Sequence, residues 1–257
     1  LSFPTVSAGN LLNVTYYDDY AFTTETAPVE SLEKVAGVVT GGKTRILGKD
    51  TWLTNVVYYD NRLRPIKTVS GNHLGGKDSV NLEYRNMISG LVAKSTRFHQ
   101  VGTVTTTIEE QYTYDHLDRL KAITHKLNDD DAKTILAQTY NDRGELVSKN
   151  LGGAQTVDYT YNIRRWLTKI NGGTSLTGTD KFSMELQYEN AGANAQHNGN
   201  VGTMKWKTLG LGENESLQTY SFDYDPMSRM SKADYVGAGN KSLSNITYDH
   251  NSNLKTL

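Results

Sequence analysis

One short pattern returns along most of this chain and limits what the chain can fold into. Each copy has an alternating, strand-like segment, a tyrosine, an aspartate or asparagine, a short turn, and then an arginine or similar residue followed by a leucine. The key tyrosines are Tyr59, Tyr114, Tyr140, Tyr161, Tyr224 and Tyr248, with weaker copies at Tyr84 and Tyr188. The copies recur about every 27 residues on average, which is a period typical of repeat architectures. One supersecondary unit is therefore stacked several times.

Each copy predicts an antiparallel β-hairpin. Tyr112 and Tyr114 alternate with polar residues, which places them on one strand face that we expect to be buried. The side chain of Asp115 can bond to the backbone N–H two residues on and so close an Asx-turn. Leu120 then opens the returning strand, and Ile123 lies on the opposite parity. The returning strand therefore either contains a bulge or packs on both faces.

Hairpins laid side by side can form a solenoid, a barrel or a shell. The spacing between copies varies too much for the nearly constant rungs of a tight β-helix, so we favour a loosely coiled strip with inserts at the hairpin tips. If Tyr161 is buried between hairpins, its replacement by alanine is expected to cost about 3–5 kcal/mol of stability.

The composition removes several classes of function. The chain has 257 residues, no cysteine, and 27 Lys and Arg against 28 Asp and Glu. It therefore has no disulfide framework, no thiolate zinc site and no cysteine nucleophile. Only 37% of the residues are hydrophobic, so the core must be thin or distributed. No stretch reaches the roughly 20 apolar residues of a membrane helix, and we expect no membrane insertion. The opening LSFPTVSAGN has neither an initiator Met nor a signal-peptide pattern, so we expect a fragment of a longer protein.

No motif in the chain predicts catalysis or metal binding. The recurring carboxylates stand at the same position of each repeat, which favours a role in turns over paired acids with separated pKa values. The six histidines form neither an HExxH motif nor a pair at helical metal spacing. The acidic run at 129–131 lacks the glycine and the distal glutamate of a calcium loop, so a solvated hairpin tip is favoured. The sequence thus predicts no enzyme, no catalytic residue, no cofactor and no metal.

The densest basic and aromatic cluster lies at residues 164–166, with Lys169 nearby. Such a cluster could stack on and neutralise a single nucleic acid strand. The formal net charge of the whole chain is only −1, which favours cation–π or salt-bridge support between strands. We therefore expect no nucleic acid partner.

The repeated Tyr-Asp units followed by Arg-Leu resemble the YD repeats of the Rhs family. The blocks VDYTYNIRRWLTKING, TWLTNVVYYDNRLRPI and SGNHLGGKDSV are similar to the version common in Bacteroidota. This resemblance implies an all-β fold of repeated antiparallel β-hairpins that form a spiralling strip or hollow shell, as in toxin-complex and teneurin YD shells. It also implies a longer secreted or cell-surface polypeptide that encloses, carries or presents a C-terminal toxin or effector. Its partners would be that cargo, the rest of the shell and possible secretion machinery.

Residues 1–50 are then a divergent opening segment of the same shell, and residues 51–257 form the repeat region. The residues taken as structural repeat positions are Tyr59, Asp60, Tyr114, Asp115, Arg119, Leu120, Tyr140, Gly144, Leu146, Tyr161, Leu167, Tyr224, Asp225, Tyr248 and Asp249.

The chain departs from the family at one turn position. The residue four after the key tyrosine is usually glycine, but here only Gly144 keeps it; the others are Leu63, Asp118, Arg165, Ser228 and Ser252. If the position requires a positive φ, leucine and arginine would be strained there. We therefore predict another turn geometry or register at Leu63 and Arg165.

Two other functions stay open at this stage. An extracellular adhesin could bind glycans or neighbouring cells through exposed aromatic and Asn-rich loops. Exposure of Trp52, Trp166 and Trp206 in a groove would favour it, and packing of these rings between hairpins would weaken it. A glycan hydrolase needs two convergent carboxylates, and the sequence nominates no such pair.

Overall fold

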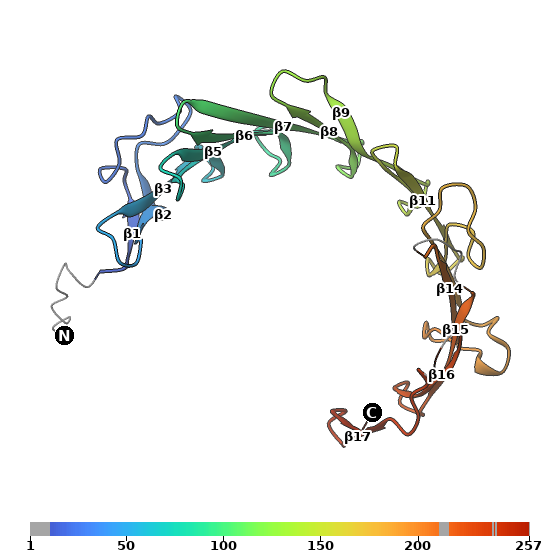
Figure 1. The fold of residues 1–257 in the computed structure, drawn as a ribbon. Coiled ribbons are helices and arrows are strands. Elements are labelled where there is room, and N and C mark those ends of the chain that lie inside the picture. Colours follow the sequence, from blue (N-terminus) through green and yellow to red (C-terminus); the bar gives the residue numbers. More distant parts are fainter. Residues whose placement is uncertain (1–10, 211–215, 238, 240, 257) are drawn as a thin grey trace. The chain divides into compact units, whose positions relative to one another are not determined.

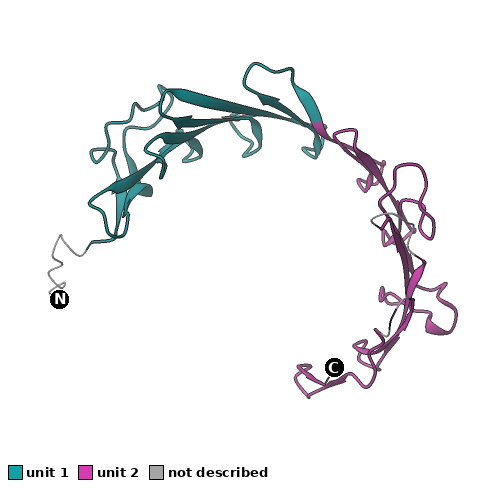
Figure 2. Ribbon diagram, viewed as in Figure 1, with its two compact units in different colours: residues 1–134 teal, residues 135–257 magenta. Residues whose placement is uncertain are grey.

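The computed structural model describes residues 11–210, 216–237, 239 and 241–256. In these residues the protein is all-β, with one short 3-10 turn at Gly192–Asn194 and no α-helix. The chain divides into two compact units, residues 1–134 and 135–257 (Figure 2). The boundary at residue 50, which separates the divergent opening segment from the recognisable repeats, rests on sequence alone and stays a prediction.

In the first unit, each strand pairs antiparallel with the next one in the chain (Figure 1). The strands are β1 (Asn13–Asp18), β2 (Val35–Arg45), β3 (Trp52–Tyr59), β4 (Pro65–Gly71), β5 (Lys77–Tyr84), β6 (Val92–Val101), β7 (Val104–Tyr114) and β8 (Leu120–Leu127). The sequence prediction of stacked β-hairpins is confirmed.

The second unit is built in the same way, beginning with β9, whose first two residues precede the boundary. Its strands are β9 (Lys133–Tyr140), β10 (Leu146–Leu151), β11 (Gln155–Tyr161), β12 (Leu167–Ile170), β13 (Phe182–Gln187), β14 (Thr203–Thr208), β15 (Gln218–Tyr224) and β16 (Met230–Val236). A separate two-stranded hairpin, β17 (Thr247–Tyr248) and β18 (Leu254–Thr256), ends the described chain.

A β-bulge accompanies the key tyrosine in most copies. Thr113 pairs with Ala122 but Tyr114 pairs with Leu120, so the returning strand carries one extra residue. The register shifts in the same way at Tyr59, Tyr84, Tyr161, Tyr224 and Tyr248. The bulge is therefore the correct choice between the two alternatives that the sequence left open.

The core is thin. The buried hydrophobic residues of the described chain are Val35, Val56, Tyr58, Val69, Tyr188, Ala233 and Ile246. The predicted burial of the key tyrosine face is only partial: Tyr112, Tyr114 and Tyr161 are half-buried, and Tyr188 is buried. Within each unit the strands lie beside one another in a single layer (Figure 1), which agrees with so small a number of buried hydrophobic residues.

The exception is the face of β3 that lies under the loop between β1 and β2. Tyr58 in this face is fully buried, and its ring stacks on Tyr20 of the loop with the centroids 4.8 Å apart. The Tyr58 hydroxyl donates to the Glu25 carbonyl at 2.8 Å, and Lys77 on β5 pairs with the Glu25 carboxylate at 2.5 Å. Residues 19–34 thus form a strap over the sheet, and this strap creates the best-buried core of the first unit.

Candidate functional site

The turn after each key tyrosine is a compact Asx-turn. In the first copy the Oδ1 atom of Asp60 accepts the N–H groups of Arg62 at 2.8 Å and Arg64 at 3.0 Å. The backbone N–H of Asp60 donates to the Arg64 carbonyl at 3.0 Å. The same side-chain bonds to the second and fourth residues occur at Asp115, Asn141, Asn162, Asp225 and Asp249. The Asx-turn predicted from sequence is confirmed.

These turns share one geometry although their sequences differ. The residue four after the key tyrosine has φ of 83° at Gly144, 59° at Leu63 and 66° at Arg165. It is also positive at Asp118, Ser228 and Ser252. The predicted change of geometry or register at Leu63 and Arg165 is therefore wrong, since the register also shifts there as in the other copies. The repeated hydrogen bonds of the turn hold this backbone in place, although the left-handed region costs a residue with a Cβ atom about 1–2 kcal/mol.

Leu63→Gly is expected to stabilise the protein by up to about 1 kcal/mol, because it relieves this strain and Leu63 is 48% exposed. Thermal unfolding of the variant and the parent measures the change. Leu117→Gly is the matched control, since Leu117 is also exposed but is not a positive-φ residue. It should destabilise by about 0.5–1 kcal/mol. If both variants shift the midpoint in the same direction, strain at Leu63 is refuted.

An ion pair closes the turn in three copies. The Arg64 Nε and Nη2 atoms both lie 2.7 Å from Asp60 Oδ2. Arg119 clamps Asp115 with both distances at 2.6 Å, and the pair of Arg229 with Asp225 is equivalent. In each pair two N–H groups of one guanidinium donate to the same carboxylate oxygen, and such charge-assisted contacts are among the stronger side-chain hydrogen bonds.

Arg119 and Asp115 were both predicted as repeat residues from the sequence, but their ion pair was not. The sequence carries a signal of this pairing, because the residue after the key tyrosine and the residue four positions later change type together between copies. Asn141 donates to Glu145 at 2.6 Å where other copies have Asp and Arg, and Asn253 donates to Asp249 at 2.9 Å.

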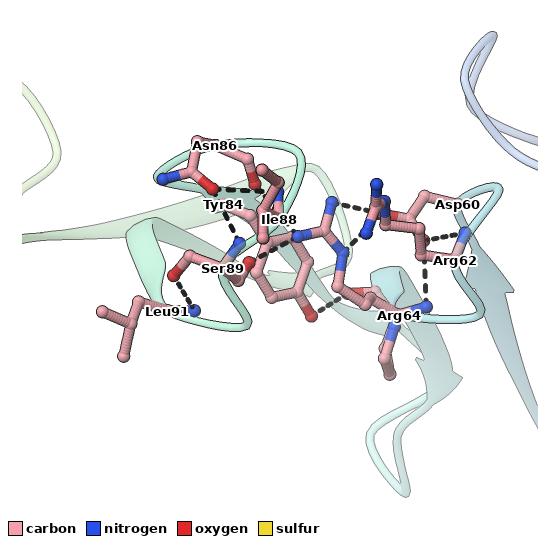
Figure 3. A network of polar contacts seen from close by, with 9 residues as sticks. Asp60, Arg62, Arg64, Tyr84, Asn86, Ile88, Ser89 and Leu91 are labelled. Atoms are coloured by element: carbon pink, nitrogen blue, oxygen red, sulfur yellow. Dashed lines mark hydrogen bonds and ion pairs between the residues drawn. The ribbon is translucent and has the colours of Figure 1, made fainter. Parts of the chain in front are cut away.

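Arg64 also reaches the next hairpin. The Arg64 guanidinium lies 4.2 Å from the Tyr84 ring centroid, and its Nη1 donates to the Ser89 carbonyl at 2.6 Å and the Asn86 carbonyl at 3.1 Å (Figure 3). Arg64 therefore joins its own turn, the ring of the next key tyrosine and the next turn.

Two further arginines repeat this contact. Arg229 lies 4.6 Å from the Tyr248 ring centroid and donates to Ser252 Oγ at 3.2 Å. Arg85 lies 5.9 Å from the Tyr114 ring centroid and forms an ion pair with Asp118.

The tyrosine hydroxyls complete the linkage in the opposite direction. Tyr161 donates to the Leu146 carbonyl at 3.0 Å, and Tyr188 donates to the Leu167 carbonyl at 2.8 Å. Both acceptors open the returning strand of the preceding hairpin, as the sequence predicted for leucines at this position. Equivalent bonds join Tyr84 to Pro65, Tyr114 to Val92, and Tyr248 to Met230, while Tyr59 and Tyr224 donate to Val39 and Val201. Tyr140 donates to Gln138 Oε1 at 3.2 Å.

The turn aspartates predict how stability depends on pH. The backbone and side-chain hydrogen bonds of Arg229 lower the pKa of Asp225. Burial alone would raise the pKa of Asp60 and Asp115, but hydrogen bonds from Arg64 and Arg119 outweigh it and lower both. A carboxyl whose pKa is lower in the folded state stabilises the fold above its unfolded pKa. This stabilisation is lost as the pH falls through the folded pKa.

We expect the thermal midpoint to hold steady near neutral pH and to fall below about pH 4. Asp225→Asn tests the cause, because Asn141 and Asn162 show that asparagine can form the same turn. The variant should lose less stability on acidification than the parent. A midpoint that already falls between about pH 7 and 5, or an unchanged acid response in the variant, would contradict this assignment.

The remaining candidates of the sequence occupy ordinary structural places. The guanidinium of Arg164 lies 5.0 Å from the Trp166 ring, as expected for cation–π support. Residues 129–131 are exposed at a hairpin tip. No group of three or more His, Asp or Glu side chains in the described residues could hold a metal ion. No helix in the described part of the chain is long and apolar enough to span a membrane.

The three tryptophans differ in their surroundings. The Trp166 ring packs 5.0 Å from Tyr188, and Trp206 lies 5.7 Å from Tyr220. Trp52 is half-buried and lines two hollows of about 230 and 240 Å³. Two of the three possible anchors of an adhesin are therefore packed against rings of neighbouring strands.

No family model and no curated protein matches the chain. Among solved structures, it is similar to parts of a complex titled "TcdB2-TccC3-Cdc42" (14% identity, TM-score 0.36) and of the Photorhabdus luminescens "Tc holotoxin pore" (10% identity, TM-score 0.34). The alignments cover 88% and 95% of this chain but only 12% and 16% of the matched chains. A third match, titled "TcdB2-TccC3", has 15% identity and a TM-score of 0.35 over 84% of this chain and 12% of that one.

All three matched structures name TccC3 in their titles. Their TM-scores lie below 0.5, and we infer neither the shape nor the function of this chain from them. The chain spans less than a fifth of their length.

Proposed function

We propose that this chain is a structural wall segment of a YD-repeat shell of the Rhs type, with repeats of the Bacteroidota kind. The complete protein is secreted or displayed at the cell surface, and its shell encloses, carries or presents a C-terminal toxin or effector. In this proposal the chain performs no chemical step, and its partners are the cargo and the rest of the shell.

The observation that supports this proposal is how the repeat side chains are used. Within each unit, the turn carboxylates are held by the arginine or asparagine of their own turn. The arginines and tyrosine hydroxyls then bind the neighbouring hairpin. The carboxylates that could suggest paired catalytic acids therefore close their own turns, and the arginines and tyrosines beside them join one hairpin to the next, as a wall requires.

A protection experiment on the full product of the native gene tests the proposal. We expect limited proteolysis to spare a segment outside residues 1–257 while the repeats are folded. The double variant Arg119→Ala and Arg229→Ala removes two turn clamps, and it should make that segment sensitive at lower protease concentration. If every segment outside residues 1–257 is cleaved at the same rate in the double variant as in the parent, enclosure of a cargo is refuted.

Trp52 favours a second candidate, the glycan-binding adhesin. It lines both small hollows, and the pair formed by Glu25 and Lys77 borders one of them. An aromatic face beside polar groups suits the stacking of a sugar ring. Glycan-array binding that is lost in Trp52→Ala and kept in Trp206→Ala would support this function. An array without binding would refute it.

A further inference from the structure

Two Asn-Gly dipeptides of the second unit lie in different environments. They are Asn171–Gly172, after β12, and Asn198–Gly199, in the loop between β13 and β14. In such a dipeptide the glycine nitrogen can attack the asparagine side-chain carbon, because no Cβ hinders its approach. The local structure decides whether the two groups can meet.

Asn198 is exposed and its side chain stays close to the following backbone. Its Oδ1 accepts the N–H of Asn200 at 3.0 Å, and its Nδ2 donates to Ser228 Oγ at 2.9 Å. Gly199 has a φ of 100°, and a Cβ atom there would lie 3.2 Å from the Trp166 ring. The fold therefore requires glycine directly after Asn198, and the reactive dipeptide is retained.

A cation lies beside this dipeptide. The Arg164 Nη1 donates to the His197 carbonyl at 2.8 Å, and its guanidinium lies 5.0 Å from the Trp166 ring, the ring that a Cβ atom at Gly199 would approach. His197 is itself exposed. A positive charge at this point favours the negative charge that develops when the Gly199 nitrogen attacks.

Asn171 offers a natural comparison, because it is half-buried and both ends of its amide bond to the backbone of the strands β11 and β13, whereas the partners of Asn198 lie in its own loop and at the side chain of Ser228. Its Oδ1 accepts the Asp158 N–H at 2.8 Å, and its Nδ2 donates to the Phe182 carbonyl at 2.6 Å. Its own N–H also donates to the Asp158 carbonyl at 2.8 Å. These bonds must open before the side chain can turn towards the Gly172 nitrogen.

We propose that Asn198 is a site of spontaneous covalent modification in the folded protein. The Gly199 nitrogen bonds to the Asn198 Cγ while the bond from Cγ to Nδ2 breaks, and the amide proton leaves with Nδ2 as ammonia. Water then opens the resulting succinimide to aspartate or isoaspartate. The product gains one negative charge and loses the donor to Ser228, which is part of the next key turn.

Peptide mapping by mass spectrometry after incubation of the folded protein in mildly alkaline buffer tests this proposal. We expect Asn198 to convert about tenfold or more faster than Asn171, since Asn171 is half-buried and has one additional hydrogen bond, from its own backbone N–H to the Asp158 carbonyl. In denaturant the two asparagines should convert at similar rates, which shows that the difference comes from the fold. Asn198→Gln should abolish the conversion at this loop.

Two results would overturn the proposal. Equal conversion of both asparagines in the folded protein would remove the selectivity, and faster conversion at Asn171 would reverse it. Arg164→Gln examines the guanidinium separately: we expect slower conversion at Asn198 with no change at Asn171. An unchanged rate at Asn198 would refute the role given to Arg164.

Discussion

Tyr58→Ala is expected to lower the free energy of unfolding by about 3–5 kcal/mol, the usual loss for a large buried aromatic residue. Tyr58 has no exposed surface, and it carries both the ring contact with Tyr20 and the bond to the Glu25 carbonyl. Burial raises the pKa of Tyr20 to about 12 and also raises that of Tyr58, as expected for hydroxyls shielded from water. Replacing Tyr58 by alanine would therefore release the strap formed by residues 19–34 and also leave a cavity.

Chemical denaturation of the Tyr58 variants measures this effect. Tyr58→Phe keeps the ring and should cost only about 1 kcal/mol, the typical value of one hydrogen bond. Tyr161→Ala is the matched comparison for position in the repeat. Because Tyr161 is half-buried, we now expect a loss of about 2 kcal/mol in place of the 3–5 predicted from sequence. If Tyr161→Ala costs as much as Tyr58→Ala, the strap adds nothing to the core.

Arg64→Ala is expected to lower the free energy of unfolding by about 2–4 kcal/mol. The Arg64 and Asp60 side chains are only 17% and 12% exposed, so the variant leaves a carboxylate poorly solvated. It also removes the donor to the Ser89 and Asn86 carbonyls. The same denaturation experiment measures the loss.

Two substitutions control for the loss of a positive charge. Arg62→Ala removes a charge from the same turn, but Arg62 is exposed, and we expect a change within about 0.5 kcal/mol. Arg64→Lys should fall between the two alanine variants, because lysine keeps the charge but not the bidentate geometry. Equal effects of Arg62→Ala and Arg64→Ala would mean that net charge, not the linkage, governs stability.

The sequence predicted the parts of the fold that depend on neighbouring residues. The hairpin period and the Asx-turn at Asp115 follow from local backbone chemistry, and both are confirmed. The turn at Leu63 was mispredicted because intrinsic φ preference is weaker than the hydrogen bonds that hold this turn. The φ preference of a residue correctly predicts the energetic cost of a positive φ, but it does not say whether other contacts of the turn offset that cost.

Contacts between hairpins could not be predicted in the same way. Tyr58 and Tyr59 are adjacent in the chain, and only the bulge and the strap determine which ring is fully buried. The contact of Arg64 with Tyr84 depends on the register of strands that the sequence does not specify. In the repeats, the residue after the key tyrosine and the residue four positions later change type together. This pattern was visible in the sequence, and it could have revealed the side-chain contact that closes the turn.

A double-mutant cycle between Arg64 and Tyr84 tests most directly whether the repeat residues hold consecutive hairpins together. The free energies of unfolding of Arg64→Ala, Tyr84→Leu and the double variant are compared with that of the parent. The cost of leaving Asp60 without its partner occurs in both Arg64 variants and cancels in the cycle. We predict a favourable coupling of about 1 kcal/mol, as expected for a partly buried guanidinium on an aromatic ring. Additive effects within about 0.3 kcal/mol would contradict the linkage of neighbouring hairpins through these side chains.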